Sequence, residues 1–163
     1  MINHKVLTLA ENLQKIYLEN NLTLATAESC TGGLLGAILT SIPGSSSYYY
    51  GGAIVYANHA KEIFAAVDGE IIKTQGAVSS EVAKKLALGI RAKLKAAVGV
   101  GITGIAGPAG GTPDKPVGLV YVGIADTRGV KVYKFHFSGN RQEIREKTVI
   151  EVLKLLIQNC FDN

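Results

Sequence analysis

The segment that most constrains this 163-residue chain lies between Leu22 and Ile42. Residues 22–27 form a short apolar run that mixes Thr with Leu and Ala, which is typical of a strand. Residues 34–42 form a second run, in which the leucines and isoleucines recur at helical spacing. A turn that ends on Gly32 and Gly33 separates the two runs. A strand that passes through a tight turn into a helix is typical of α/β proteins, so we expect that fold class here.

The turn itself reads Glu28-Ser29-Cys30-Thr31-Gly32-Gly33 and carries a hydroxyl and a thiol just before the helix. A helix that begins there points its free backbone N–H groups and the positive end of its dipole at the turn. Such a geometry suits an anion or a developing oxyanion. The alternative is an ordinary capped turn, in which the glycines only permit tight passage of the backbone. Taken alone, the turn leaves both interpretations open.

Apolar patterns along the rest of the chain extend the α/β interpretation. We expect helices over 4–19, from Asn58 as a cap, after a cap at Ser79 or Ser80, and over 141–158. We expect a turn at Asp68-Gly69. We expect strands over 53–56, 96–103, 117–125 and 130–137, the last two forming a hairpin. The order of elements predicts one domain over residues 1–163, an α/β/α sandwich of three layers with a central mixed, mostly parallel sheet.

Polar residues follow three of the predicted strands. Ser29 follows the first strand, Tyr56 and Asn58 follow the second, and Thr103 ends the third. A long Gly- and Pro-rich loop, residues 104–116, comes next, and such loops in compact domains are usually functional or disordered. Ligands of open α/β sheets bind beyond the carboxyl ends of the parallel strands. The sequence therefore predicts a site at this edge of the sheet.

Composition excludes several classes of protein. No apolar run reaches membrane-spanning length and no signal peptide precedes the first helix, so we expect a cytoplasmic protein with no membrane partner. The net charge of +4 is concentrated on the predicted helix after Ser79, where a solvated face explains it, and no Arg-rich run or nucleic-acid module is present. Nucleic acid is therefore not an expected partner. Two cysteines and three histidines without partners at ligand spacing predict neither metal nor cofactor.

Residues Gly99 to Gly104 match the pattern G-x-G-x-x-G, which in a dinucleotide-binding protein joins a strand to a helix. Here the glycines fall within the predicted strand itself, and a Pro/Gly loop follows where a helix is required. We therefore reject a dinucleotide fingerprint and expect these glycines to mark close packing of the backbone.

A serine nucleophile requires a base. His136 alternates with phenylalanines in the predicted hairpin and is expected to be structural. His59 is expected at the surface, with a helper role near the site as the alternative. Lys61 is the other candidate, because a lysine buried in a pocket loses its proton more easily and then can accept one from a serine hydroxyl. The alternative is a solvated lysine on a helix, and local spacing does not distinguish the two.

Several motifs taken in order resemble the carboxy-terminal domain of the CinA family, over roughly residues 8 to 157. They are Glu28-Ser29-Cys30-Thr31-Gly32-Gly33, Pro43-Gly44-Ser45-Ser46, Tyr56-x-Asn58-x-x-Lys61, the loop Thr103-Gly104-Ile105-Ala106-Gly107-Pro108 with its continuation to Gly118, and Phe137-Ser138-Gly139-Asn140-Arg141-x-x-Ile144-Arg145. One departure is Asn140, where the family often has Asp, although the arginine after it is present. The chain resembles the stand-alone form, since it is too short for the family's amino-terminal domain, and we expect no activity on ADP-ribose.

The family includes amidohydrolases that convert nicotinamide mononucleotide to nicotinate mononucleotide and ammonia. The resemblance implies that Ser29 is the nucleophile, Lys61 the base and Tyr56 a hydroxyl partner, without metal. It also implies a set of substrate-binding residues: Cys30, Thr31, Gly32, Gly33, Asn58, Thr103, Gly104, Gly107, Arg141 and Arg145.

Within that set, we expect the N–H groups of residues 30–32 to hold the oxyanion, and the loop with Arg141 or Arg145 to hold the phosphate. Alternatives remain open: pairing of the arginines with Glu143 or Glu146 along the helix, and capping by Thr31. A homo-oligomer is expected from family resemblance and from the aromatic run 48–50. The rival function is a nucleotide- or partner-binding module without catalysis, linked to competence or DNA damage.

Overall fold

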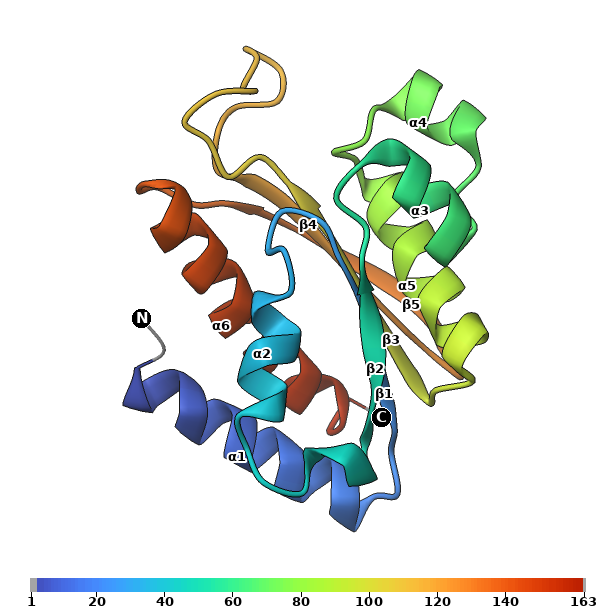
Figure 1. The fold of residues 1–163 in the computed structure, drawn as a ribbon, viewed down its shortest axis with the longest axis vertical. Helices are drawn as coiled ribbons and strands as arrows, with labels where there is room; N and C mark the ends of the chain where they lie inside the picture. The colour runs from blue at the N-terminus through green and yellow to red at the C-terminus, as the bar shows by residue number, and fades with distance from the viewer. Residues whose placement is uncertain (1–2, 163) are drawn as a thin grey trace.

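A computed structural model describes residues 3–162 of the chain (Figure 1). Its elements in chain order are α1 (His4–Glu19), β1 (Leu24–Glu28), α2 (Leu34–Thr40), a short 3-10 turn η1 (Ser45–Ser47), β2 (Tyr49–Ile54), α3 (Asn58–Ala65), α4 (Gly69–Gln75), α5 (Ser80–Leu94), β3 (Val98–Gly104), β4 (Leu119–Asp126), β5 (Gly129–His136) and α6 (Arg141–Asn159).

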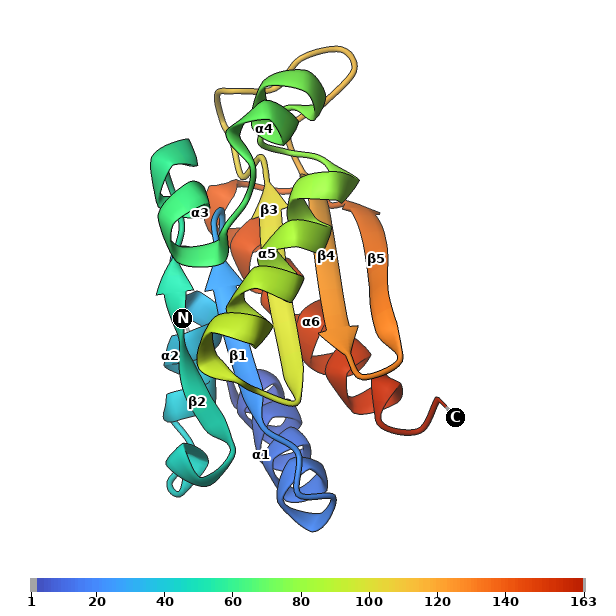
Figure 2. The same ribbon diagram turned by 90° about the vertical axis from the view of Figure 1, so that its right-hand side faces the viewer.

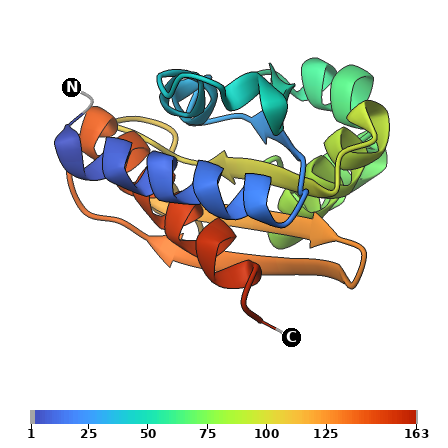
Figure 3. The same cartoon turned by 90° about the horizontal axis from the view of Figure 1, so that it is seen from below.

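The five strands form one mixed sheet in the order β2-β1-β3-β4-β5 (Figure 2). Strands β2, β1 and β3 are parallel, and β4 and β5 continue the sheet in antiparallel fashion. Helices α1, α2 and α6 cover one face, and α3, α4 and α5 lie on the other (Figure 1). Seen from below, α1 and α6 lie side by side on their face (Figure 3). The predicted α/β/α sandwich and its mixed sheet are therefore confirmed.

The register of the parallel strands aligns their carboxyl ends. Glu28, the last residue of β1, is paired with Ile54 of β2 and with Ile102 of β3. The chain leaves all three strands at the same edge of the sheet. The long loop between β3 and β4 and helix α4 project from this end of the molecule (Figures 1 and 2).

Two apolar clusters hold the layers together, one on each face of the sheet. The larger contains buried side chains from α1, α2 and α6, and the smaller contains those from α3, α4 and α5. Helix α5 approaches β3 closely because Gly99 and Gly101 have no side chain. A Cβ on Gly101 would lie 2.5 Å from the backbone oxygen of Ala83. The glycines of the rejected dinucleotide motif thus serve close packing, as expected.

Strand β2 begins earlier than the predicted strand 53–56, because the tyrosine run before it joins the fold. Tyr48 is fully buried and packs edge-on against Tyr17 with ring centroids 5.7 Å apart. Tyr49 lies in β2, and its hydroxyl forms a 2.8 Å hydrogen bond with Thr26. Tyr50 is the exposed residue of the run, so of the three tyrosines it is the one available to a surface between subunits.

Local differences also occur around α3 and α4. Asp68 and Gly69, predicted as a turn, begin helix α4, and the Asp68 carboxylate accepts a 2.9 Å hydrogen bond from the N–H of Glu70. Asn58 is the first residue of α3 and makes no capping hydrogen bond, so the predicted cap is wrong. Ser79 caps α5, as predicted. No helix among residues 3–162 combines the length and hydropathy needed to cross a membrane.

Candidate active site

A cleft of about 250 Å³ opens at the carboxyl edge of the parallel strands. It is lined by residues that follow β1, β2 and β3, by the loop after β3, and by the first residue of α6. Nine of the thirteen predicted site residues lie in its wall: Ser29, Cys30, Tyr56, Asn58, Lys61, Thr103, Gly104, Gly107 and Arg141. The fold therefore brings together groups that are separated by up to 112 positions in the sequence, from 29 to 141.

Ser29 stands one residue beyond β1 and is 7% exposed. Its N–H donates to the carbonyl of Ile102 at 3.0 Å, which continues the pairing of β1 with β3. Its own carbonyl accepts the N–H of Gly32 at 3.0 Å and closes a tight turn. Gly32 and Gly33 have φ angles of +58° and +93°, in the left-handed region that glycine adopts without strain. The serine is thus fixed at the lip of the cleft by its backbone.

The carboxylate of Glu28 lies buried behind this turn. It accepts four hydrogen bonds, from the Thr31 hydroxyl at 2.7 Å and from the N–H groups of Gly33, Leu35 and Gly36 at 3.1, 3.1 and 2.8 Å. The start of α2 is therefore already occupied by an anion of the chain itself. Sequence reasoning missed this role, because Glu28 lies six positions before the helix and shows no local capping pattern.

These contacts reduce the number of backbone N–H groups that can form the expected oxyanion site. The N–H of Gly32 is used within the turn, and that of Gly33 is used by Glu28. The N–H groups of Cys30 and Thr31 donate to no carbonyl or carboxylate of residues 3–162. Of the three N–H groups expected at residues 30–32, two thus have no carbonyl or carboxylate partner; Cys30 belongs to the cleft wall, whereas Thr31 is fully buried outside it.

Lys61 lies in the first turn of α3 and is 2% exposed. Its Nζ donates to the carbonyls of Val55 at 2.9 Å and Tyr56 at 3.2 Å, just past the end of β2. No carboxylate within the described chain forms an ion pair with it. Burial lowers the pKa of Lys61 below the usual 10.5, because the charged ammonium loses hydration. A solvated helical lysine is therefore excluded.

Cys30 is the other nucleophilic side chain in the cleft, and it is 5% exposed. Burial raises the pKa of its thiol to about 12, with a smaller contribution from Glu28. A thiol with this pKa stays protonated at neutral pH and is a poor nucleophile. Of Ser29 and Cys30, the serine hydroxyl, which lines the same cleft as the buried lysine, is the better candidate.

Arg141 connects the two sides of the cleft. One of its guanidinium nitrogens donates to the Tyr56 hydroxyl and the other to the carbonyl of Gly107 at 2.8 Å. Thr103 donates its hydroxyl to the carbonyl of Ala77 at 2.7 Å and so anchors the segment before α5. Tyr56 and Asn58 are exposed at the mouth. Arg141 thus binds across the site rather than along its own helix.

Four predicted residues lie outside the cleft wall: Thr31, Gly32, Gly33 and Arg145. The Thr31 hydroxyl donates to Glu28, which corresponds to the capping alternative. Arg145 donates to the carbonyl of Thr31 at 2.8 Å and to Gln142 at 2.9 Å. Both contacts place it behind the serine turn, away from the cleft.

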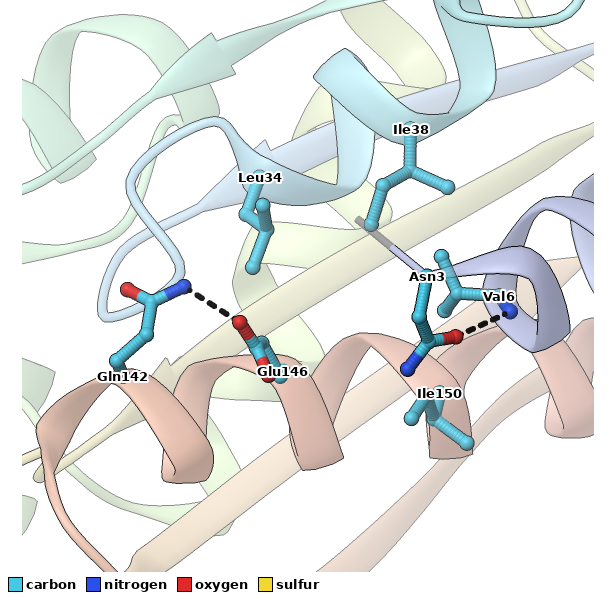
Figure 4. Close-up of a pocket in the computed structure, with 7 residues that line it drawn as sticks. All are labelled: Asn3, Val6, Leu34, Ile38, Gln142, Glu146 and Ile150. Carbon is cyan, nitrogen blue, oxygen red and sulfur yellow. Dashed lines mark hydrogen bonds between the residues drawn. The ribbon is translucent and has the colours of Figure 1, made fainter. Parts of the chain in front are cut away.

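The histidines do not enter the cleft. His59 is exposed on α3, and His136 of β5 contacts the carbonyl of Val117 at 3.2 Å. A second, smaller cavity lies between α1, α2 and α6 (Figure 4). Its wall is mainly apolar, with Asn3, Gln142 and Glu146 at its polar positions, and it contains none of the predicted site residues.

The fold and the cleft together define an α/β/α domain with a serine turn and a buried lysine at the carboxyl edge of its parallel strands. The family model described as the CinA C-terminal domain matches residues 6–160, and the chain therefore belongs to the CinA family. A "CinA-like protein" of Acidobacterium capsulatum is 49% identical over 150 residues, which cover 90% of this chain and 36% of that protein.

A "CinA-like protein" of a Cyanothece species is 51% identical over 134 residues, covering 82% of this chain and 32% of the relative. The chain spans about a third of the length of the curated relatives it matches. Among solved structures, the competence/damage inducible protein CihA of Agrobacterium tumefaciens is 38% identical with a TM-score of 0.94, and 97% of each chain is covered.

Proposed function

We propose that this chain hydrolyses the carboxamide of nicotinamide mononucleotide to nicotinate mononucleotide and ammonia, with Ser29 as nucleophile and Lys61 as base. One observation carries the proposal. A lysine with a lowered pKa and no carboxylate partner in the described chain lines the same cleft as a serine fixed at a strand end. Ser–Lys pairs of this type are an alternative to the Ser–His pair of other hydrolases.

The chemistry explains why each part is needed. A carboxamide is a weak electrophile and its amine a poor leaving group, so the reaction needs an activated nucleophile, an oxyanion site and a proton donor. The neutral amine of Lys61 accepts the proton of Ser29 as its oxygen bonds to the carboxamide carbon. Collapse of the tetrahedral intermediate breaks the C–N bond, and Lys61 returns the proton to the departing ammonia. Water then hydrolyses the acyl ester in the same way and releases the nicotinate product.

The substrate contacts follow from the placement of the other residues. The N–H of Cys30, which lines the cleft, would hold the oxyanion together with that of Thr31 in the same turn, because neither donates to a carbonyl or carboxylate of the described chain. Arg141 and the backbone of the loop around Gly107 would hold the phosphate, because both line the cleft and a guanidinium is a good phosphate donor. Tyr56 would present its hydroxyl at the mouth, where Arg141 holds it.

Ammonia release from nicotinamide mononucleotide tests the proposal. Wild type should release ammonia without added metal, and Ser29→Ala and Lys61→Met should lose at least about 100-fold in kcat, which is typical for loss of nucleophile or base. Lys73→Met is the matched control, since Lys73 is exposed on α4, and it should retain wild-type activity. Circular dichroism establishes that each variant is folded.

The measured ammonia release distinguishes the Ser–Lys amidase from its alternatives. Equal release by wild type, Ser29→Ala and Lys61→Met would reject the Ser–Lys mechanism. No release by the wild type would reject the amidase and favour the module that binds a nucleotide or partner without catalysis.

A further inference from the structure

The serine turn is held from behind by two charged side chains that are not in the cleft. The Glu28 carboxylate accepts a hydrogen bond from the Thr31 hydroxyl at 2.7 Å, and Arg145 donates to the carbonyl of Thr31 at 2.8 Å. The first contact comes from the end of β1 and the second from the first turns of α6, 114 positions away. One residue of the turn is thus fixed both by its side chain and by its backbone.

Glu28 has the burial and the hydrogen bonds needed to fix the position of the serine turn. It is 2% exposed, and its two oxygens accept three N–H groups of the α2 start besides the Thr31 hydroxyl. Hydrogen bonds to a carboxylate are stronger than those between neutral groups. The carboxylate therefore ties residues on both sides of the turn to the end of β1, next to Ser29.

Arg145 contacts the same residue, Thr31, at its backbone carbonyl. Its Nη1 is held by the side-chain oxygen of Gln142 at 2.9 Å, so the guanidinium is oriented by its own helix toward Thr31. A Cβ on Gly32 would meet its Nη2 at 3.6 Å, so the arginine packs directly on the glycine of the turn. Arg145 thus links the start of α6 to the carbonyl of Thr31, two residues after Ser29.

The hydrogen bonds of Glu28 determine which backbone N–H groups can bind the oxyanion. Since Glu28 occupies the N–H groups at the start of α2, the helix end cannot receive a developing negative charge. Only the Cys30 and Thr31 N–H groups of the turn remain, and their direction depends on how the Thr31 residue is held. Oxyanion donors act through a fixed geometry set before the reaction.

We infer that Glu28 and Arg145 are positioning residues, which clamp Thr31 from two sides and so aim the free N–H groups of the turn at the reacting carbonyl oxygen. The inference rests on the proposed function, because it concerns the same reaction. It gives Arg145 a role other than binding the substrate phosphate, which had been expected from the resemblance.

The test compares kcat and KM of Arg145→Met and Arg145→Lys on nicotinamide mononucleotide. Misplacing the turn should lower kcat by ~10–100-fold in Arg145→Met, with KM within about twofold of wild type. Arg145→Lys retains one donor that can reach Thr31 and should recover most of kcat. The pH profile of kcat/KM should keep its midpoint in both variants, because Lys61 is unchanged.

Nicotinamide riboside, which lacks the phosphate, separates positioning from phosphate binding. A positioning role predicts that Arg145→Met loses the same factor with both substrates. A phosphate-binding role predicts a higher KM for the mononucleotide alone, with the riboside unaffected, and that result would overturn the inference. A wild-type kcat in Arg145→Met would overturn it as well.

Glu28→Gln tests the other side of the clamp and should also lower kcat with little change in KM. Its control is Asp126→Asn, the same carboxylate-to-amide change at a carboxylate that accepts bonds from Arg128 and Asn159 at the opposite end of the sheet. That variant should lose stability but keep kcat.

If Glu28→Gln does not fold, the kinetics of the Arg145 variants decide whether the positioning inference holds. An inactive wild type overturns both proposals, whereas an active wild type with unaffected clamp variants overturns the positioning inference alone.

Discussion

Among the described residues, the carbonyls of Val55 and Tyr56 are the groups that accept hydrogen bonds from the buried amine of Lys61. Two effects act on its pKa: burial lowers it, and the charge of a Cys30 thiolate would raise it by a smaller amount. The thiol of Cys30 has a pKa of about 12, so it carries no charge over the range in which the lysine titrates. Burial is therefore the effect that remains, and it places the pKa of the amine below the usual 10.5, so the amine loses its proton at a lower pH than an exposed lysine does.

The first prediction concerns the pH dependence of the amidase. Since the neutral amine is the active form, kcat/KM should rise with pH through the lowered pKa of Lys61 and level off before pH 10.5. Initial rates of ammonia release across pH 6 to 10 (roughly the range between ordinary His and Lys pKa values) measure this. Lys61→Arg should be inactive throughout, because a guanidinium does not lose its proton. A profile that falls over this range would contradict the assignment of Lys61 as base.

The position of Ser29 and Lys61 at one edge of the sheet could be predicted from the strand order and the motifs, but the burial of Lys61 could not. Whether a lysine is solvated or buried depends on how α3 docks against the end of β2, which spacing along the chain does not specify. The role of Glu28 was equally hidden. Its carboxylate meets Gly36 eight positions later only because the turn folds back on itself.

At the scale of elements, the packing of α5 against β3 determines how closely the helix layer approaches the sheet. Gly101 lies opposite the backbone of α5, where a Cβ would meet the oxygen of Ala83, the nitrogen of Ala87 and the Cβ of Leu86, each at 2.5 Å. None of these atoms is the end of a flexible side chain. A methyl group at this position must therefore move a helix or a strand.

We expect Gly101→Ala to lower the free energy of unfolding by about 1–3 kcal/mol or more, as overpacking does in well-packed cores. Urea unfolding followed by circular dichroism measures the change. Gly69→Ala provides the comparison, since Gly69 begins α4 and its nearest neighbours are the movable carboxylate atoms of Glu62 at 3.3–3.4 Å. That variant should be neutral or stabilised by up to about 1 kcal/mol through helix propensity. Equal effects at both glycines would contradict the packing explanation.

Long periodic elements were predictable and short ones were not. Helix α1 occupies the predicted range, because its apolar residues repeat over four turns. Helix α4 has seven residues, and Asp68-Gly69 at its start is equally typical of a turn. In β2, the aromatic run and two glycines interrupt the alternation of apolar and polar residues that is typical of a strand. The backbone is also irregular there, since Gly51 has a φ of +126° and the register with β1 shifts beside it. Local irregularity of this kind is not readable from periodicity.

At the scale of the whole molecule, exposed apolar side chains gather at one edge. Among the described residues, five of the seven large exposed hydrophobic side chains lie on β2 and α3 or between them: Tyr50, Ile54, Tyr56, Ile63 and Phe64. Strand β2 is an edge strand, paired only with β1. No Asp, Glu, Lys or Arg occurs from Ser29 to Ala60, although charged residues make up 18% of the chain.

Edge strands of monomeric proteins are usually protected by charges, because open N–H and C=O groups invite pairing with another chain. The β2 edge has none of these charges. It also passes into Tyr56 at the mouth of the cleft, so a chain docked there would lie beside the proposed site. The homo-oligomer expected from the sequence therefore remains a prediction, and this edge is where we expect the copies to meet.

Sedimentation velocity with wild type and Ile54→Lys tests this prediction. Ile54 is 57% exposed on β2, so a lysine there should leave the fold intact but place two like charges in an interface between copies. We expect wild type to sediment as a dimer or larger species and Ile54→Lys to shift toward the monomer. Leu18→Lys is the control, because Leu18 is 42% exposed on α1, away from the edge, and its change should leave sedimentation unaltered. A monomeric wild type would show that the uncharged edge is left open in solution, and a shift in both variants would place the interface elsewhere.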